Sequence, residues 1–370
     1  MESLLPWLVL KNIPGIGNHI YKRLIDQFRS PDRVLAATDE ELLSVNGMTG
    51  RLVSAIRRHQ TPDSIRRELD LTSEKGFDII PLTDPDFPAL LLQIPDPPPY
   101  LYLFGSLKLL KNPIAVVGSR NATDYGVLTT RRLSADLATR GITIVSGMAI
   151  GIDTAAHQGA LSVNGQTVAV LGSGLDYIYP RENKALFYEI AKHGAVVSEF
   201  PLKEEPKASN FPQRNRIISG MSLGTVIVEA AKQSGSLITA RLAAEQGREV
   251  FAVPGSIRSF KSAGTHGLIK QGAKLVEHAG DIIEELSRVM SVEPQPESVD
   301  EPEQPSSDTF ALSGEEIKVI HGLEPYPIHI DDLARKVAMD SGKLAAILLK
   351  LEIHGIVRQS PGKRFTKIER

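Results

Sequence analysis

Apolar residues in the middle of the chain fall into six short runs that are separated by stretches long enough for helices. Runs that are rich in valine and isoleucine and apolar at every position are typical of strands buried on both faces of a parallel sheet. Their alternation with helical stretches predicts an α/β fold with an extended, Rossmann-like, doubly wound parallel sheet. The predicted strands are 114–117, 143–145, 168–171, 195–197, 226–228 and 250–253, with helical stretches such as 127–140, 181–193 and 237–247.

The first 75 residues have a helical pattern that occurs twice. A turn with two glycines joins two apolar helical stretches within 10–28, and a second glycine-containing turn does the same within 42–56. This arrangement resembles a tandem helix-hairpin-helix (SAM-like) domain, whose turn glycines let backbone amides approach a phosphate. Two roles stay open: DNA contact through Gly15, Gly17 and Lys22, or a structural or protein-docking role.

Residues 291–308 mark the clearest boundary in the chain. They hold six acidic residues and no basic ones, and they are rich in proline and serine. Such a segment buries too little apolar surface to offset the entropy of ordering it, which predicts a solvated linker. A functional acidic tail that mimics DNA is the alternative. The predicted domains are therefore a helical domain over 1–75, a Rossmann-like core over 76–290, the linker over 291–308 and a further domain over 309–370.

The last 62 residues resemble a winged helix. Three helical stretches precede two short segments that can pair as a β-wing. The helices are expected at 315–323, 330–338 and 342–354, and the wing strands at 355–358 and 364–367. The segment is only mildly basic, so DNA contact and protein docking both stay open.

Composition excludes several classes of protein. Cysteine is absent, which excludes disulfides, thiolate nucleophiles and iron–sulfur clusters and fits a reducing cytoplasm. No apolar run reaches the roughly 18 residues of a membrane helix, and the start of the chain lacks the features of a signal peptide. The nine histidines show no metal-ligand spacing, so no metal site is expected. The net charge of −2 arises in the acidic linker and does not exclude nucleic-acid binding.

Three of the predicted strands run directly into glycine- and serine-rich turns. These turns contain Gly118-Ser119-Arg120, then Gly147, and then Gly172. Because the carboxyl ends of parallel strands meet at one edge of a sheet, the turns should form a line of amides and hydroxyls suited to phosphate. Arg120 adds a cationic fork for a phosphate oxygen. No G-x-G-x-x-G follows the first strand and no P-loop is present, so no cofactor is expected.

The loop after the fourth predicted strand is the most distinctive stretch. It is rich in proline, carries Lys203 and Lys207, and ends in Phe211-Pro212. An exposed aromatic ring among cations suits single-stranded nucleic acid, because the ring stacks on a base while the cations hold the backbone. Pro212 predicts an extended conformation for Phe211, which would hold the ring away from the strand ends.

The helix that should follow this loop begins with Arg214-Asn215-Arg216. Two arginines cannot be buried without partners at low cost, so at least one is expected to face the same groove. The alternative places Phe211 in the core and pairs the arginines with Glu199 and Glu229.

Asp153 and His157 lie four residues apart on a predicted helix. They are either a catalytic pair or a helix-capping aspartate with a structural histidine nearby, and we expect the second. No catalytic residue is predicted.

Nearly the whole chain resembles the DprA/Smf family of DNA-processing proteins. The resemblance rests on PLTDPDFP over 81–88, Gly118-Ser119-Arg120, SGMAIGID over 146–153, FPQRNRII over 211–218 and SGSLITA over 234–240. It implies a core that binds single-stranded DNA without sequence preference, dimerises and loads the recombinase RecA, with single-strand binding protein as a further candidate partner. The DNA-binding residues it implies are Gly118, Ser119, Arg120, Gly147, Lys207, Phe211, Arg214, Asn215 and His266.

The chain departs from the family pattern at two positions. Ala208 stands where members often have a basic residue, three positions before the loop aromatic. His266 ends a Gly-Thr-His turn in which many members have asparagine. Both departures concern how the DNA backbone is held.

An apolar set at the end of the predicted core is expected to form a homodimer interface. A two-fold contact would use this patch twice, whereas the alternative is that the side chains cover their own sheet. The set comprises Leu268, Ile269, Leu275, Val276, Ile282 and Ile283.

The favoured function is therefore binding without catalysis. The alternative is a Rossmann-like enzyme that cleaves the glycosidic bond of nucleoside monophosphates. That class uses a Pro-Gly-Gly-x-Gly-Thr-x-x-Glu turn, of which this chain has only Gly224-Thr225 and an acid, Glu229, shifted by one position.

Overall fold

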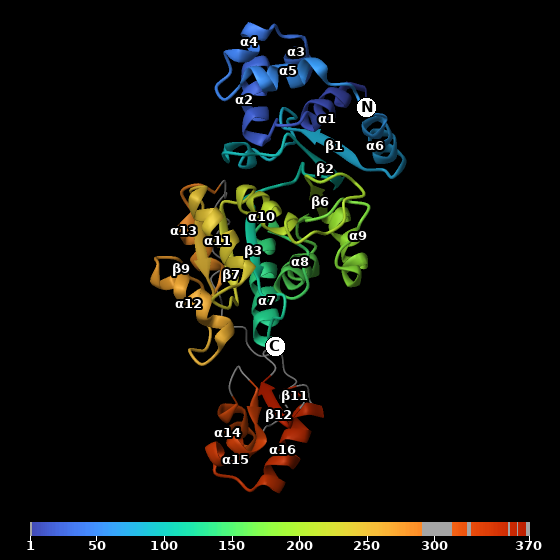
Figure 1. The fold of residues 1–370 in the computed structure, drawn as a ribbon. Helices are drawn as coiled ribbons and strands as arrows, with labels where there is room; N and C mark the ends of the chain where they lie inside the picture. The colour runs from blue at the N-terminus through green and yellow to red at the C-terminus, as the bar shows by residue number, and fades with distance from the viewer. Residues whose placement is uncertain (1, 291–312, 324–326, 354–355, 361, 368–370) are drawn as a thin grey trace. The chain divides into compact units, whose positions relative to one another are not determined.

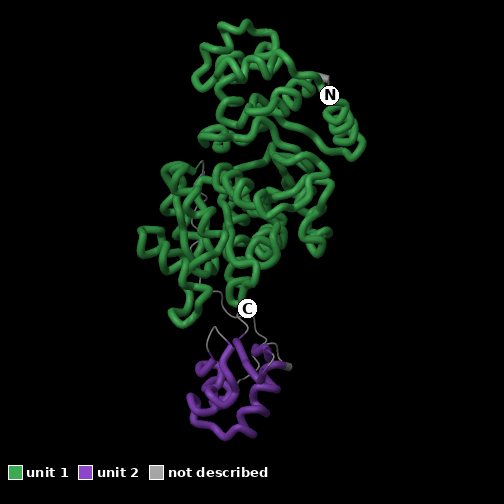
Figure 2. Tube along the Cα trace, in the orientation of Figure 1, with its two compact units in different colours: residues 1–292 green, residues 293–370 purple. Residues whose placement is uncertain are grey.

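The computed structural model describes residues 2–290, 313–323, 327–353, 356–360 and 362–367. The chain divides into two compact units, Met1–Val292 and Glu293–Arg370 (Figure 2). The predicted linker over 291–308 lies outside the described residues. None of the described helices is long and apolar enough to cross a membrane.

The first unit is built on one large sheet, in which nine strands are described (Figure 1). The strands are β1 (Asp78–Pro81), β2 (Tyr100–Gly105), β3 (Ile114–Gly118), β4 (Ile144–Ser146), β5 (Thr167–Val170), β6 (Gly194–Ser198), β7 (Gly224–Val228), β8 (Glu249–Ala252) and β9 (Lys274–Leu275). They lie in the order β1-β2-β6-β5-β4-β3-β7-β8-β9. Following this order across the sheet, every neighbouring pair from β6 through β5, β4, β3, β7 and β8 to β9 is parallel. β2 pairs antiparallel with both β1 and β6. The predicted doubly wound sheet is confirmed, and β1, β2 and β9 add to the six predicted strands.

Helices cover both faces of this sheet. Its helices are α7 (Asp124–Thr139), α8 (Ile152–Ser162), α9 (Lys184–His193), α10 (Asn210–Gly220), α11 (Gly235–Glu245), α12 (Ala263–Lys270) and α13 (Ala279–Leu286), with short 3₁₀ turns η2 (Leu91–Gln93), η3 (Arg181–Asn183) and η4 (Phe260–Ser262). Side chains alternate across a strand, so Ile114 and Val116 of β3 join a core with α7, α8 and α13. Ala115 and Val117 join a second core, with α10 and α11.

The N-terminal helices belong to the same unit. They are η1 (Glu2–Leu4), α1 (Leu5–Asn12), α2 (Asn18–Phe28), α3 (Pro31–Ala36), α4 (Asp39–Leu43), α5 (Gly50–Arg58) and α6 (Asp63–Glu74). Their buried side chains share a hydrophobic cluster with β1 and β2. Gly15 has a φ of +92°, and a Cβ there would lie 2.7 Å from Leu52 Cδ2, so this turn needs glycine for structural reasons. Lys22 pairs with Asp26 at 2.7 Å.

The second unit is a winged helix, as predicted. It contains α14 (Gly314–Gly322), β10 (Ile328–His329), α15 (Ile330–Val337), α16 (Ser341–Ile353), β11 (Val357–Ser360) and β12 (Arg364–Lys367). β12 pairs antiparallel with both β10 and β11. A capping box between Ser313 and Glu316 begins α14. Leu333, Leu344 and Leu348 are fully buried in a core of their own. Residues 354 and 355, predicted as the end of the last helix and the start of the first wing strand, lie outside the described residues.

Candidate nucleic-acid interface

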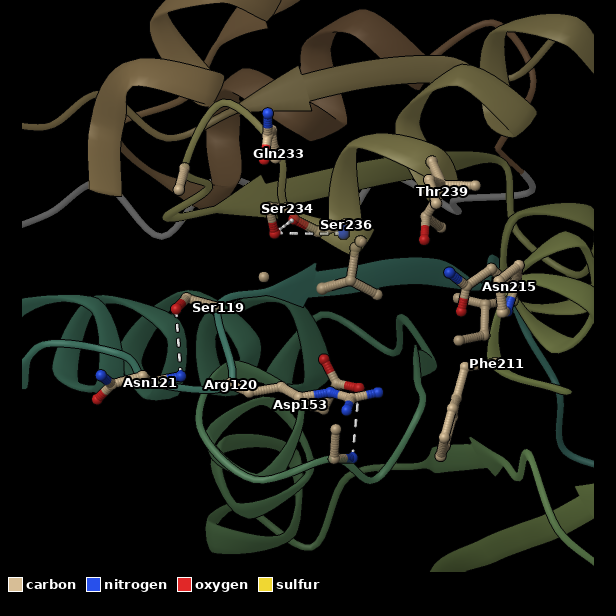
Figure 3. Close-up of a pocket in the computed structure, with 18 of the residues that line it drawn as sticks. Ser119, Arg120, Asn121, Asp153, Phe211, Asn215, Gln233, Ser234, Ser236 and Thr239 are labelled. Carbon is tan, nitrogen blue, oxygen red and sulfur yellow. Dashed lines mark hydrogen bonds between the residues drawn. The ribbon is translucent and has the colours of Figure 1, made fainter. Parts of the chain in front are cut away.

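A cleft of about 570 Å³ opens at the carboxyl edge of the large sheet. The chain passes from β3 to β4 on one side and from β7 to β8 on the other, so the loops after β3 and β7 diverge. A crevice forms where such loops part, and ligands of open α/β sheets bind there. Residues 118–121 after β3 and residues 233–236 before α11 line it (Figure 3).

Most of the charged side chains that line this cleft are cationic. Arg120, Arg214 and Lys261 contribute positive charge, and Asp153 is the one carboxylate among the lining residues. Asp153 is buried, which raises the pKa of its carboxyl group, and its Oδ2 accepts from the Ala149 amide at 3.3 Å. The cleft therefore favours an anionic ligand.

Asp153 does not cap its helix, contrary to the prediction. Gly151, with a φ of +83°, is the N-cap of α8, and Asp153 is the second residue of the helix. A Cβ at Gly151 would lie 2.4 Å from the Ser119 carbonyl oxygen, so the β3 and β4 turns pack too closely for a larger capping residue. The Asp153 carboxylate instead holds the loop before the helix through the Ala149 amide.

His157 is a buried structural histidine, as expected. The Thr167 hydroxyl donates its hydrogen to the Ile144 carbonyl at 2.8 Å, so it accepts from His157 Nδ1 at 2.7 Å. Burial, together with the charge of Arg214, lowers the pKa of His157 to about 3. The imidazole is therefore neutral and hydrogen-bonded to Thr167. This bond gives His157 a structural role and argues against a catalytic pair with Asp153.

Arg120 and Phe211 form the most distinctive contact of the cleft. Arg120 is exposed, and its Cζ lies 4.7 Å from the centroid of the Phe211 ring, within range for a cation–π contact. The half-buried Phe211 ring belongs to neither hydrophobic cluster of this unit. Its other neighbours are Tyr179, with ring centroids 6.0 Å apart, and Gly172, where a Cβ would lie only 2.8 Å from the ring. Glycine at 172 makes room for the phenylalanine.

Phe211 is helical, and the predicted extended conformation is wrong. Helix α10 begins at Asn210, so Phe211 and Pro212 both lie in its first turn. Proline is tolerated there because the first amides of a helix have no intrahelical acceptor. The ring nevertheless reaches the cleft and also lines a smaller cavity of about 100 Å³ together with Arg120, Gly147 and Arg214.

Arg214 and Arg216 are both buried, and each has partners that offset the cost of burial. Arg214 lines the groove, as was expected of at least one of the two arginines. Arg214 Nη1 donates to the Gly147 carbonyl at 2.7 Å and to the Val170 carbonyl, and burial lowers its pKa to about 10. It lines the cleft but is 4% exposed, which makes it a positioning residue between α10 and two strand ends. Gly147 has no room for a side chain, because a Cβ would lie 2.2 Å from Arg214 Nη1.

The second arginine takes no part in the cleft. Arg216 forms ion pairs with Glu199 and, at 3.1 Å, with Asp96. The predicted partner Glu199 is confirmed, whereas the second proposed acid, Glu229, instead accepts from the Thr123 amide at 2.8 Å and from its hydroxyl.

Comparison with known proteins identifies the family. Residues 78–287 match the family model of DNA recombination-mediator protein A, and residues 301–363 match that of the DprA winged helix domain. The chain belongs to the DprA family. It is 33% identical to protein Smf of Synechocystis over 98% of each chain.

Two solved DprA structures resemble this chain. The X-ray structure of DprA from Streptococcus pneumoniae matches with a TM-score of 0.62 and 36% identity, over 75% of this chain and 96% of that one. DprA from Helicobacter pylori, whose structure is described as giving insight into its single-stranded DNA binding mode, matches with a TM-score of 0.53 and 31% identity, over 58% of this chain and 97% of that one. This chain is accordingly a DNA-processing protein of the DprA family.

The structure brings most of the implied DprA site residues together, but not all of them. The large cleft, the small cavity or both are lined by Gly118, Ser119, Arg120, Gly147, Phe211, Arg214 and Asn215. Lys207 lines neither cavity and pairs with Glu204 at 2.7 Å. His266 also lines neither, and its Nε2 lies 3.0 Å from the Gly255 carbonyl.

The proposed dimer patch needs correction at two positions. Val276 is 1% exposed and Ile282 is fully buried, and both pack beneath the sheet with α7 and α8. They cover their own core because β9 and α13 close this edge of the fold. Leu275 remains 40% exposed, and Leu268, Ile269 and Ile283 are partly exposed.

Sequence reasoning missed two parts of the cleft. Ser234 caps α11 by accepting from the Ser236 amide at 3.4 Å, and residues 233–236 form one wall (Figure 3). The loop before α12 contributes Phe260 and Lys261 to the rim. A signal for the second was available in the sequence, because Phe260 lies between Arg258 and Lys261, and an aromatic residue near cations was the feature that singled out Phe211.

Proposed function

We propose that this DprA-family protein binds single-stranded DNA without sequence preference in the large cleft, protects it and loads RecA onto it, without catalysis. The observation that carries the proposal is the exposed Arg120 guanidinium over the Phe211 ring at a cationic cleft. The likeness to Helicobacter pylori DprA, a protein described as binding single-stranded DNA, supports it.

The geometry suits a ligand of alternating phosphates and bases. Arg120 is exposed at the cleft, and among the described residues it forms no ion pair, although the Asp153 carboxylate lies near enough to interact with its charge. Its guanidinium can therefore bind a phosphate oxygen. Backbone amides of the turn after β3 lie beside it. A base can stack on Phe211 or on the guanidinium plane, and every base has such a face. Recognition by charge and stacking gives affinity without sequence preference.

Assembly is the second part of the proposal. The protein acts as a homodimer through Leu275 and its neighbours, with RecA as its partner and single-strand binding protein as a further candidate. The exposed Leu275 at the end of the sheet supports the dimer contact.

Replacing Arg120 tests the binding site. Arg120→Ala should weaken binding of oligo-dT and reduce the slope of log affinity against log salt by about 1, because one phosphate contact is lost. Fluorescence anisotropy across a salt series measures both quantities. Arg132→Ala removes an exposed arginine of α7 that lines neither cavity, and it should leave both unchanged. Equal affinity and slope in a folded Arg120→Ala protein would contradict the proposal.

Two further assays separate the remaining alternatives. Mixed-sequence oligonucleotides should bind as oligo-dT does, and DNA coated with single-strand binding protein should acquire RecA faster when the protein is present. Incubation with a panel of nucleoside monophosphates should release no free base. Base release that depends on residues of the cleft would instead establish the glycosidic hydrolase.

A further inference from the structure

We propose that the loop over residues 254–262, between β8 and α12, is a second contact for single-stranded DNA. In it, Phe260 stacks on a base while Arg258 and Lys261 hold the backbone. The inference rests on the proposed function and extends the path of the strand beyond Phe211.

Phe260 is an exposed aromatic side chain on an ordered loop. It is 72% exposed, and Ile257 on the same loop is 91% exposed. Successive turns hold the backbone beneath them: the Ser259 amide donates to the Ser256 carbonyl at 3.0 Å, and the Ser262 amide donates to the Ser259 carbonyl at 3.1 Å. A ring fixed in this way loses little conformational freedom when a base stacks on it.

The loop is bonded to the cleft near its end and to α7 at its start. Lys261 Nζ donates to the carbonyl of Asn121, in the turn that carries Arg120. At the start of the loop the Tyr125 hydroxyl donates to the Pro254 carbonyl at 3.3 Å. Phe260 and Lys261 line only the large cleft, whereas Phe211 also lines the small cavity. Two aromatic rings, one from the first turn of α10 and one from the loop before α12, therefore border one cationic cleft, which allows a strand of DNA to contact both.

The charge of the loop favours DNA over another protein surface. Between Glu249 and Glu277 the sequence has four lysines and arginines and no acidic residue. Arg258 is exposed and forms no ion pair with any carboxylate in the described part of the chain. A second copy of the chain is the competing occupant, since the loop precedes α12 of the proposed dimer patch. Two such loops facing each other across a two-fold axis would bring like charges together.

A tryptophan at position 260 provides a direct test. The chain has one tryptophan, Trp7, which is buried, so Trp7→Phe gives a background without tryptophan. In that background Phe260→Trp should show fluorescence quenching when saturating oligo-dT binds, because the indole stacks on a base. Leu109→Trp, at a side chain that is 65% exposed before β3, is the matched control and should show no quenching.

Affinity across an oligo-dT length series tests the energetic role. Phe260→Ala should bind long oligonucleotides roughly 5- to 150-fold more weakly than the parent, which corresponds to about 1–3 kcal/mol for one stacked base. On the shortest oligonucleotides that still bind, which occupy only the Phe211 end, it should match the parent. Arg258→Ala should reduce the salt slope on long oligonucleotides only.

The outcomes distinguish this inference from the proposed function. If Phe260→Ala binds every length as the parent does while Arg120→Ala binds weakly, the second contact is refuted and the cleft stands. If the parent itself does not bind oligo-dT, both are refuted. If Phe260→Ala changes the sedimenting species and leaves DNA affinity intact, the loop is a contact between copies of the chain. Absence of quenching at saturation also overturns the proposal.

Discussion

The Phe211 ring shows how single residues shape this site. Arg120 covers one part of the ring, and the space left by the missing side chain of Gly172 receives another part. The ring is thus positioned before any ligand arrives, although it belongs to no hydrophobic core. A side chain held this way is suited to stacking, because little rotamer entropy is lost on binding.

Truncation of Phe211 should therefore affect binding more than stability. Phe211→Ala should cost about 1–3 kcal/mol of oligo-dT affinity and change the melting temperature little. A core phenylalanine would instead cost about 3–5 kcal/mol of stability. Phe211→Trp should keep the affinity. Melting temperature and oligo-dT affinity, measured on the same samples, distinguish the stacking role from a core role. A large fall in melting temperature with unchanged affinity would show that Phe211 is a core residue.

His157 makes folding stability depend on pH. Its pKa of about 3 in the folded state lies below the usual 6.5, so the unfolded chain binds the extra proton between these values. The stability contribution is present above pH 6.5 and is lost as the pH falls. Lowering the pH from 7 to 5 should remove about 2 kcal/mol through this residue. Urea unfolding at both pH values should show a smaller loss for His157→Asn, which cannot titrate; an equal loss would contradict the assignment.

At the scale of elements, a buried ion pair fixes α10 to the sheet. Arg216 of α10 contacts Glu199, just after β6, and both side chains are 7% exposed. Burial raises the pKa of Glu199, and the charge of Arg216 opposes this effect. The helix that carries Phe211 is thereby held at the carboxyl edge.

Removing one partner of this pair should destabilise the protein strongly. Arg216→Met leaves the Glu199 carboxylate buried without its main partner, which should cost about 3–5 kcal/mol in urea unfolding. The double variant Arg216→Met/Glu199→Leu should recover much of that loss, since two apolar side chains can replace a buried pair. Lys192→Met breaks the exposed pair with Glu189 and should cost less than about 1 kcal/mol. Equal costs for the buried and exposed pairs would refute the argument.

At the scale of the whole molecule, the exposed part of the apolar set predicts self-association. Leu275→Glu should convert a dimer into a monomer in sedimentation, because a buried carboxylate at a two-fold contact would face its own copy. Leu275 is the cleaner test, since Ile283 packs partly against its own core. Leu109→Glu changes an exposed leucine elsewhere and should leave the dimer intact. If parent and Leu275→Glu sediment as the same species, this patch is not the interface.

Fold and site were predictable from the sequence to different degrees. The six central strands could be predicted because burial on both faces requires continuous apolar runs. The edge strands β1 and β9 were not predicted, because β1 ends in a proline and β9 has only two residues. β2, which lies between β1 and β6, was not predicted either. The Gly118-Ser119-Arg120 turn was predictable because the end of a strand determines its edge of the sheet. The loop around Phe260 was not predicted as part of the cleft, because it follows β8, which lies two strands from β3 in the sheet and is far from it in the sequence.

By itself the sequence determined the six central strands, their parallel arrangement, the winged helix and the line of turns at one edge of the sheet. These follow from local patterns, because hydrophobic periodicity and glycine turns act over a few residues. The tertiary structure alone decided which charged groups are buried. Arg214 and Arg216 lie two residues apart, yet one is held by strand-end carbonyls beside the cleft and the other pairs with two acids away from it. It also decided that Val276 and Ile282 belong to the core while Leu275 stays exposed. Burial and pairing depend on neighbours distant in sequence, and only the folded chain brings those neighbours together.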